Sequence, residues 1–166
     1  VKGALKKGEF EVWFQPQYDY ETSALIGAEA LVRWRHPERG LIPPADFIPL
    51  LERSRQVTFV DTYVIEKSCA YAKYWQERGI ELPISVNISR IDILGGKICR
   101  TIYDTVKKLG IEPRLIKLEI TESAYTSDTE ALKSVVTDFK AAGFTVEMDD
   151  FGSGYSSLNI LKDLDI

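Results

Sequence analysis

The sequence contains very little histidine and cysteine, which limits the metal and nucleophile chemistry that it can support. Among its 166 residues, His36 is the only histidine, and the two cysteines, Cys69 and Cys99, show no CxxC spacing. A zinc site with several histidines and a Cys-His nucleophile pair are therefore poorly supported. Both cysteines fall in segments with a helical pattern, so free thiols are a better expectation than a disulfide framework.

The sequence also lacks an excess of positive charge and any long apolar run. Its formal net charge of -4 argues against binding to a nucleic-acid polymer or to a membrane surface. We find no apolar run of about 18 residues and no signal-peptide pattern, so no segment is expected to span a membrane or direct export. The expected location is cytoplasmic, and any membrane anchor would lie in regions of a parent protein that are not present here.

What the sequence does contain is an alternation of strand and helix patterns, with enough apolar residues for one domain with a core. Strands are expected at 10–18, 24–34, 83–88, 115–120 and 144–148, and helices at 47–51, 57–75, 98–109 and 128–142. The first two strands are expected to form a hairpin, and residues 35–44 to form a loop. Strands that alternate with helices predict a parallel sheet, either open and doubly wound or closed into a barrel.

Four polar residues lie at or near the ends of predicted strands, namely Glu29, Asn87, Glu119 and Asp149. The last three are separated by 32 and then 30 residues, which is about the length of one βα unit. Parallel strands bring their carboxyl ends to one face of the sheet, so these side chains are expected to converge. Oxygen ligands without His or Cys select hard cations such as magnesium, manganese or calcium.

The residues next to these positions add to the predicted chemistry. Asp150 could hold a second ion, and two ions suit in-line attack on a phosphodiester. Glu122 is expected in the loop after its strand, either supporting the 150–154 loop or capping the next turn. Arg33 could contact a phosphate oxygen or be a surface charge. Trp13, Phe14, Trp34 and the other aromatic residues are expected mostly in the core, although one near the site could stack on a purine.

Four segments, in order, resemble one known family over nearly the whole chain, from about Leu5 to Ile166. They are IGAEALVRWRHPERGLIPPADFIPLLE, VNIS, LEITE and DDFGSGYSSL. Together they resemble the EAL domains, bacterial phosphodiesterases that cut the second messenger cyclic di-GMP to linear pGpG. The fold class that this implies is α/β, a TIM-type (β/α) barrel with an antiparallel first strand, incomplete in this chain.

The resemblance also implies roles for individual residues. By this match Glu29, Asn87, Glu119 and Asp149 are metal ligands, and Asp150 is the carboxylate used with a second Mg²⁺ or Mn²⁺ ion. Glu122 matches the glutamate that supports the loop after the aspartate pair. Gln15, Leu31 and Arg33 match positions that face the nucleotide or its phosphates, and Asp46 is a weaker candidate for the same role.

The family pattern continues with a catalytic lysine, a glutamate strand and a late glutamine, none of which can be assigned here. Residues 1–166 are therefore expected to be a partial EAL domain, inactive on its own, in a parent enzyme with a linked sensory or GGDEF domain. An unclosed barrel would expose an edge strand and invite pairing with a second copy, as in a homodimer.

Two other functions compete with this interpretation. A non-catalytic module that binds cyclic di-GMP would share the fold, but degenerate relatives usually have damaged metal positions, and the five visible positions are intact here. A sugar-phosphate enzyme with one magnesium ion on a barrel is the second alternative. The adjacent aspartates and the order of the four segments count against it.

Overall fold

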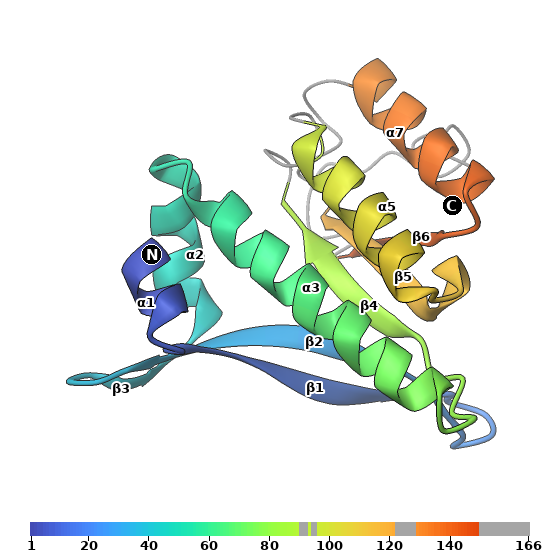
Figure 1. The fold of residues 1–166 in the computed structure, drawn as a ribbon, viewed down its shortest axis with the longest axis horizontal. Coiled ribbons are helices and arrows are strands. Elements are labelled where there is room, and N and C mark those ends of the chain that lie inside the picture. Colours follow the sequence, from blue (N-terminus) through green and yellow to red (C-terminus); the bar gives the residue numbers. More distant parts are fainter. Residues whose placement is uncertain (90–92, 94–95, 122–128, 150–166) are drawn as a thin grey trace.

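A computed structural model describes residues 1–89, 93, 96–121 and 129–149 of the chain (Figure 1). Its strands are β1 (Phe10–Tyr18), β2 (Leu25–His36), β3 (Gly40–Ile42), β4 (Ile84–Ile88), β5 (Ile116–Thr121) and β6 (Thr145–Asp149). Its helices are α1 (Lys2–Lys6), α2 (Pro44–Arg53), α3 (Val57–Gln76), α5 (Lys97–Leu109) and α7 (Thr129–Ala141), with a short 3-10 turn η1 (Pro113–Leu115). The predicted alternation of strands and helices is confirmed.

Strands β1 and β2 form the predicted antiparallel hairpin, in which Gln15 lies opposite Glu29. Asp19 closes the turn, because its Oδ1 accepts hydrogen bonds from the backbone N–H of Thr22 at 2.8 Å and from the Thr22 hydroxyl at 2.6 Å. Ser23 adopts a left-handed conformation with φ of 56°. Local hydrogen bonds of this kind are the reason that Asp and Ser favour turns.

The predicted loop at residues 35–44 is wrong in part. Strand β2 continues to His36, and β3 pairs with it so that Trp34 lies opposite Ile42. Pro37 and Gly40, whose φ is +72°, keep the reversal of the chain short. Leu41 and Ile42, which follow Gly40, can then extend the sheet. The turn chemistry was visible in the sequence, but the length of the turn was not.

The sheet has the strand order β1-β2-β4-β5-β6, with β3 attached to β2. Strands β2, β4, β5 and β6 are parallel neighbours, and β1 is antiparallel to β2. Helices α3, α5 and α7 lie side by side along one face of the sheet (Figure 1). Each of these helices connects two parallel strands, as crossover connections require.

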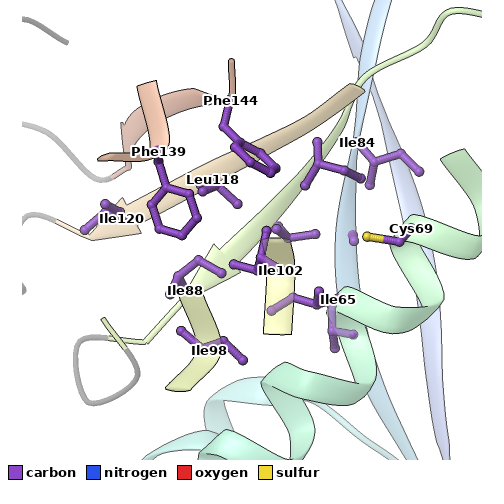
Figure 2. Close-up of a cluster of buried hydrophobic side chains, with 14 of the residues drawn as sticks. Ile65, Cys69, Ile84, Ile88, Ile98, Ile102, Leu118, Ile120, Phe139 and Phe144 are labelled. Atoms are coloured by element: carbon purple, nitrogen blue, oxygen red, sulfur yellow. The ribbon is translucent and has the colours of Figure 1, made fainter. Parts of the chain in front are cut away.

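The core lies between this sheet and its helices. The strands contribute alternate residues to it, among them Ile84, Ile88, Leu118 and Ile120, which meet Ile65, Cys69, Ile98, Ile102, Phe139 and Phe144 of the helical layer and its connections (Figure 2). In β4 and β5 the apolar residues at even positions are buried almost completely. Because successive side chains of a strand point to opposite faces, the odd positions face away from the helices.

Two helix ends show why the elements stop where they do. Helix α2 begins at Pro44, a residue that fits the first helical position, and its Phe47 packs against the rings of Phe10 and Trp34. Helix α5 ends at Gly110, which has φ of 63°. Of the helices in the described ranges, none combines the length and apolar character needed to cross a bilayer.

Candidate active site

The face of the sheet opposite the helices carries polar side chains from five neighbouring strands, and we call it the polar face. The registers pair Gln15 with Glu29, Glu29 with Ser85, Ser85 with Lys117, Asn87 with Glu119, and Glu119 with Glu147. Paired residues in a sheet project to the same side. A hydrogen-bonded ion pair of 2.8 Å joins Lys117 Nζ to Glu147 Oε1 on this face.

Two of the predicted metal ligands are in direct contact on the polar face. The side-chain amide of Asn87 donates a hydrogen bond from Nδ2 to Oε1 of Glu29 over 2.9 Å. Glu29 is half-buried and Asn87 is exposed, although 58 residues separate them in the sequence. Glu119, which lies opposite Asn87 in the next strand, is only 8% exposed. The structure therefore places three predicted ligands on adjacent strands of one face.

The expectation that Glu29 lies at or near the end of its strand is wrong. Glu29 lies in the interior of β2, seven residues before its last residue, His36. Strand β2 is longer than its parallel pairing with β4, which covers only Ala28 to Ala30. Beyond Ala30, β2 pairs with β1 and then with β3, both antiparallel. Its carboxylate reaches Asn87 because the parallel register sets Glu29 beside Ser85, two residues before Asn87 on the same face.

The other acidic positions can be followed only in part. Asp149 is the last residue of β6 and lies beside Thr121 in the register, but its side chain is not among those described. Asp150 and Glu122 lie outside the described residues. Their expected roles, as a ligand of a second ion and as a support for the following loop, remain predictions.

The donor chemistry of the polar face fits a magnesium or manganese ion. Glu29 and Glu119 offer carboxylate oxygens, and Asn87 offers an amide oxygen, which are ligands that hard cations prefer. Within the described ranges, His, Cys, Asp and Glu by themselves form no cluster of three that could hold a metal. The amide oxygen of Asn87 is a further donor on this face, and Asp149 and Asp150 stay predicted ligands.

A cavity of about 620 Å³ opens beside these residues, between the middle of β2, the carboxyl end of β4 and the helices α2 and α3. Its lining is mostly apolar and includes Leu31, Pro44, Ile48 and Val57, together with Asn87. A concave apolar site with a few polar groups is the usual form of a small-molecule site. Leu31 is thus brought to the cavity, whereas Asp46 is exposed in the first turn of α2.

Asp61 is a residue of this cavity that the sequence analysis did not identify. It projects from α3, is 9% exposed and lines the cavity. The signal was present, because Asp61 falls between Val57, Val60 and Val64 on the buried stripe of the helix. A carboxylate within an apolar stripe is uncommon unless it has a polar or charged partner.

The predicted phosphate contact, Arg33, lies on the polar face four residues after Glu29. Its Nη1 donates to the carbonyl oxygen of Val32 over 2.9 Å, and its guanidinium carbon lies 5.6 Å from the centroid of the Trp13 ring. Trp13 is 45% exposed, so the expectation that it belongs to the core is wrong. Gln15 is also exposed and lies opposite Glu29.

The sequence pattern that defines the EAL domain matches residues 1–166. The chain belongs to the EAL domain family. Among its relatives is the cyclic di-GMP phosphodiesterase PA2567 of Pseudomonas aeruginosa, which is 34% identical over 157 residues, or 95% of this chain and 27% of that protein. The bifunctional diguanylate cyclase and cyclic di-GMP phosphodiesterase MucR of the same organism is 32% identical over 99% of this chain and 24% of that protein.

Solved EAL structures agree with this assignment. The phosphodiesterase domain PaMucR in complex with cyclic di-GMP has a TM-score of 0.93 and 32% identity, covering 98% of this chain and 66% of that one. The EAL domain of FimX from Pseudomonas aeruginosa, at 20% identity and a TM-score of 0.86, shares the fold. EAL domains are TIM-type barrels, and the chain covers part of one, as the fold class predicted.

The chain spans about a fifth to a quarter of the length of the curated relatives that it matches, with shares of 20%, 21% and 27% for the Caulobacter, Bacillus and Pseudomonas proteins. What those longer proteins do is therefore not transferred to this chain as a finding. The family and its barrel fold are established for the chain itself.

Proposed function

We propose that this EAL domain binds cyclic di-GMP and hydrolyses one of its phosphodiester bonds to give linear pGpG in bacterial second-messenger signalling. The observation that carries the proposal is the contact between Glu29 and Asn87 beside Glu119, three oxygen-donor side chains on adjacent strands of the polar face. Support also comes from relatives that are named as cyclic di-GMP phosphodiesterases and from the complex of PaMucR with cyclic di-GMP.

In this proposal Glu29, Asn87, Glu119 and Asp149 hold Mg²⁺ or Mn²⁺, and Asp150 is used with a second ion. Bound ions of this kind supply an activated water and stabilise the charge that develops on the phosphate. The chain itself positions the donors: Asn87 donates its N–H to Glu29, which fixes the carboxylate and leaves the amide oxygen of Asn87 facing away from it. Glu122 supports the loop after the aspartates.

The cavity next to the site has the size and lining for a nucleobase. Leu31, Pro44 and Val57 provide apolar surface, and the buried carboxylate of Asp61 can accept hydrogen bonds from the N1–H and N2–H groups of guanine. Arg33 and Gln15 face the phosphates. Linkage to a cyclase or sensory domain is part of the proposal, and MucR is a relative whose name combines cyclase and phosphodiesterase.

A second function, binding of cyclic di-GMP without hydrolysis, is compatible with the same cavity. The intact oxygen donors favour hydrolysis over binding alone, because a module that only binds would not need Glu29 and Asn87 to be held together. The two functions differ in one observable, namely whether bound cyclic di-GMP is converted to pGpG.

The test is an assay of cyclic di-GMP hydrolysis by the protein that carries this chain, in Mn²⁺ or Mg²⁺ and in EDTA. We expect pGpG to form only with metal. Glu29→Gln, which keeps the size of the side chain and removes its charge, should lower the rate by about 100-fold or more, since it removes a ligand. Glu38→Gln, an exposed glutamate in the β2–β3 turn, is the matched control and should retain the wild-type rate.

Each alternative has a distinct outcome in this assay. Tight binding of cyclic di-GMP without pGpG in any metal would assign the domain to the binding modules. Absence of binding as well as turnover would overturn the proposed function altogether. Equal loss of activity in both glutamate variants would contradict the specific role of Glu29.

A further inference from the structure

Arg33 and Arg35 lie two residues apart on the same face of β2, and Glu11 of β1 is within reach of both. The register sets Glu11 directly opposite Arg33, and the guanidinium of Arg35 is one diagonal step away. Residues that face each other directly in an antiparallel pair interact most readily. Simple proximity would therefore predict an ion pair between Glu11 and Arg33.

The structure shows the other pairing. Arg35 donates from Nε to Glu11 Oε1 over 2.6 Å and from Nη2 to Glu11 Oε2 over 3.2 Å, a bidentate contact. Trp13 completes the arrangement by donating its indole N–H to Glu11 Oε2 over 2.9 Å. Both carboxylate oxygens of Glu11 are thus engaged. The pKa of Glu11 is lowered, first through the hydrogen bond from Arg35 and next through that from Trp13.

The guanidinium of Arg33 has different contacts from that of Arg35. In the described part of the chain it forms no ion pair, and its guanidinium rests near the Trp13 ring, with one N–H on the carbonyl of Val32. A guanidinium has five N–H donors, so most remain for another acceptor. Stacking on an aromatic face holds a cation without using those donors.

We propose that Arg35 and Trp13 are positioning residues, which occupy the carboxylate of Glu11 and so keep the guanidinium of Arg33 available for a phosphate of cyclic di-GMP. This inference rests on the proposed function. Arg35 prevents Glu11 from neutralising Arg33, and Trp13 both fixes Glu11 and supports Arg33. Without Arg35, Glu11 pairs with the arginine directly opposite and competes with the phosphate.

The first test needs no ligand and follows the Glu11 carboxyl by nuclear magnetic resonance during a pH titration. In Arg35→Met the pKa of Glu11 should stay below its ordinary value, because Arg33 takes over the contact. In Arg33→Met/Arg35→Met the pKa should rise further toward that value, since only the indole N–H remains. Equal pKa values in the two variants would overturn the proposal, because Arg33 would not have moved.

The second test measures the dissociation constant for cyclic di-GMP in EDTA, where turnover does not consume the ligand. Arg35→Met should weaken binding by about tenfold, the scale of a lost charge-assisted contact to phosphate. Glu11→Gln/Arg35→Met should restore affinity to within about twofold, because glutamine still accepts from Trp13 but does not neutralise Arg33. Arg39→Met, at an exposed arginine in the β2–β3 turn, is the matched control.

The outcomes separate the inference from the proposed function. If Glu11→Gln does not restore binding, Arg35 contacts the ligand itself and the positioning role is wrong. If Arg33→Met binds cyclic di-GMP as the wild type does, the phosphate role of Arg33 in the proposed function fails. Trp13→Leu should weaken binding about threefold in the wild-type background and not at all in Arg33→Met.

Discussion

The hydrogen bond from Asn87 to Glu29 joins two of the predicted metal ligands across neighbouring strands. An amide presents both a donor and an acceptor, so Asn87 can donate to Glu29 and still offer an oxygen to a cation. A carboxylate at position 87 would offer only acceptors. Under the proposed function, the identity of residue 87 therefore decides whether Glu29 keeps this hydrogen-bond donor.

Replacing Asn87 with aspartate should make stability depend strongly on metal. Asn87→Asp loses the donor to Glu29 and sets two carboxylates against each other, so in EDTA we expect the melting temperature to fall by about 2–4 °C. Saturating Mn²⁺ should raise the melting temperature of this variant more than that of the wild type. Asn87→Ala is the control for loss of the hydrogen bond alone. The same Mn²⁺ response in all three proteins would argue against a metal at this position.

The two cysteines differ in burial, and their reactivity should differ accordingly. Cys69 is buried in the core, and this burial, followed by the charge of Glu66, raises its pKa to about 12, whereas Cys99 is only partly buried. Because the thiolate is the reactive form, Cys69 should resist iodoacetamide at pH 8 while the chain is folded. Mass spectrometry of alkylated peptides measures this, with urea-unfolded protein as the control. Alkylation of Cys69 as fast as that of Cys99 would contradict the packing described here.

At the scale of elements, helix α5 depends on one apolar stripe that packs against the sheet. Ile98 and Ile102 are fully buried, whereas Lys107 on the same helix is exposed. Ile102→Ala should lower the free energy of unfolding by about 2–5 kcal/mol, because it removes buried methylene groups and leaves a cavity. Lys107→Ala should change it by less than about 0.5 kcal/mol. Urea denaturation measures both, and similar losses would place the core elsewhere.

The elements were predictable where one periodicity dominated. The hairpin, the parallel strands and the helices followed from alternation and from stripes such as Ile98, Ile102 and Val106. Strand β3 was missed because its three residues are too few to show a period, and its pairing with β2 is decided by the length of the turn. The predicted strand 24–34 already contained Glu29 in its interior, and what no local pattern encodes is that β4 pairs with β2 only from Ala28 to Ala30.

The convergence of the oxygen donors was predictable from their spacing. Donors one βα unit apart were expected to meet at one face of the sheet, and the structure brings Glu29, Asn87 and Glu119 onto adjacent strands of the polar face. Asp61 was missed although it lies on the buried stripe of α3 with Val57, Val60 and Val64, where a single carboxylate could have marked it. The hydrogen bonds among Glu11, Trp13 and Arg35 were not predicted, because the hairpin register decides which residues face each other across the two strands.

At the scale of the whole molecule, the two faces of the sheet have different side chains and different neighbours. One face is apolar and packs against α3, α5 and α7, which lie along it in Figure 1. The other face carries the oxygen donors and the Lys117–Glu147 ion pair. Core residues and predicted ligands therefore alternate along the same strands. Conservative changes on the polar face should affect ligand and metal binding more than folding.

The most direct test of the proposed metal site is the binding of Mn²⁺ to the chain, followed by electron paramagnetic resonance of the free ion. We expect the wild type to bind Mn²⁺, and Glu29→Gln and Glu119→Gln each to weaken binding by about 10-fold to 100-fold. Glu147→Gln removes a charge from the same face, where Glu147 pairs with Lys117, and should bind nearly as the wild type does. Equal affinity in all four proteins would contradict a metal site built by the polar face.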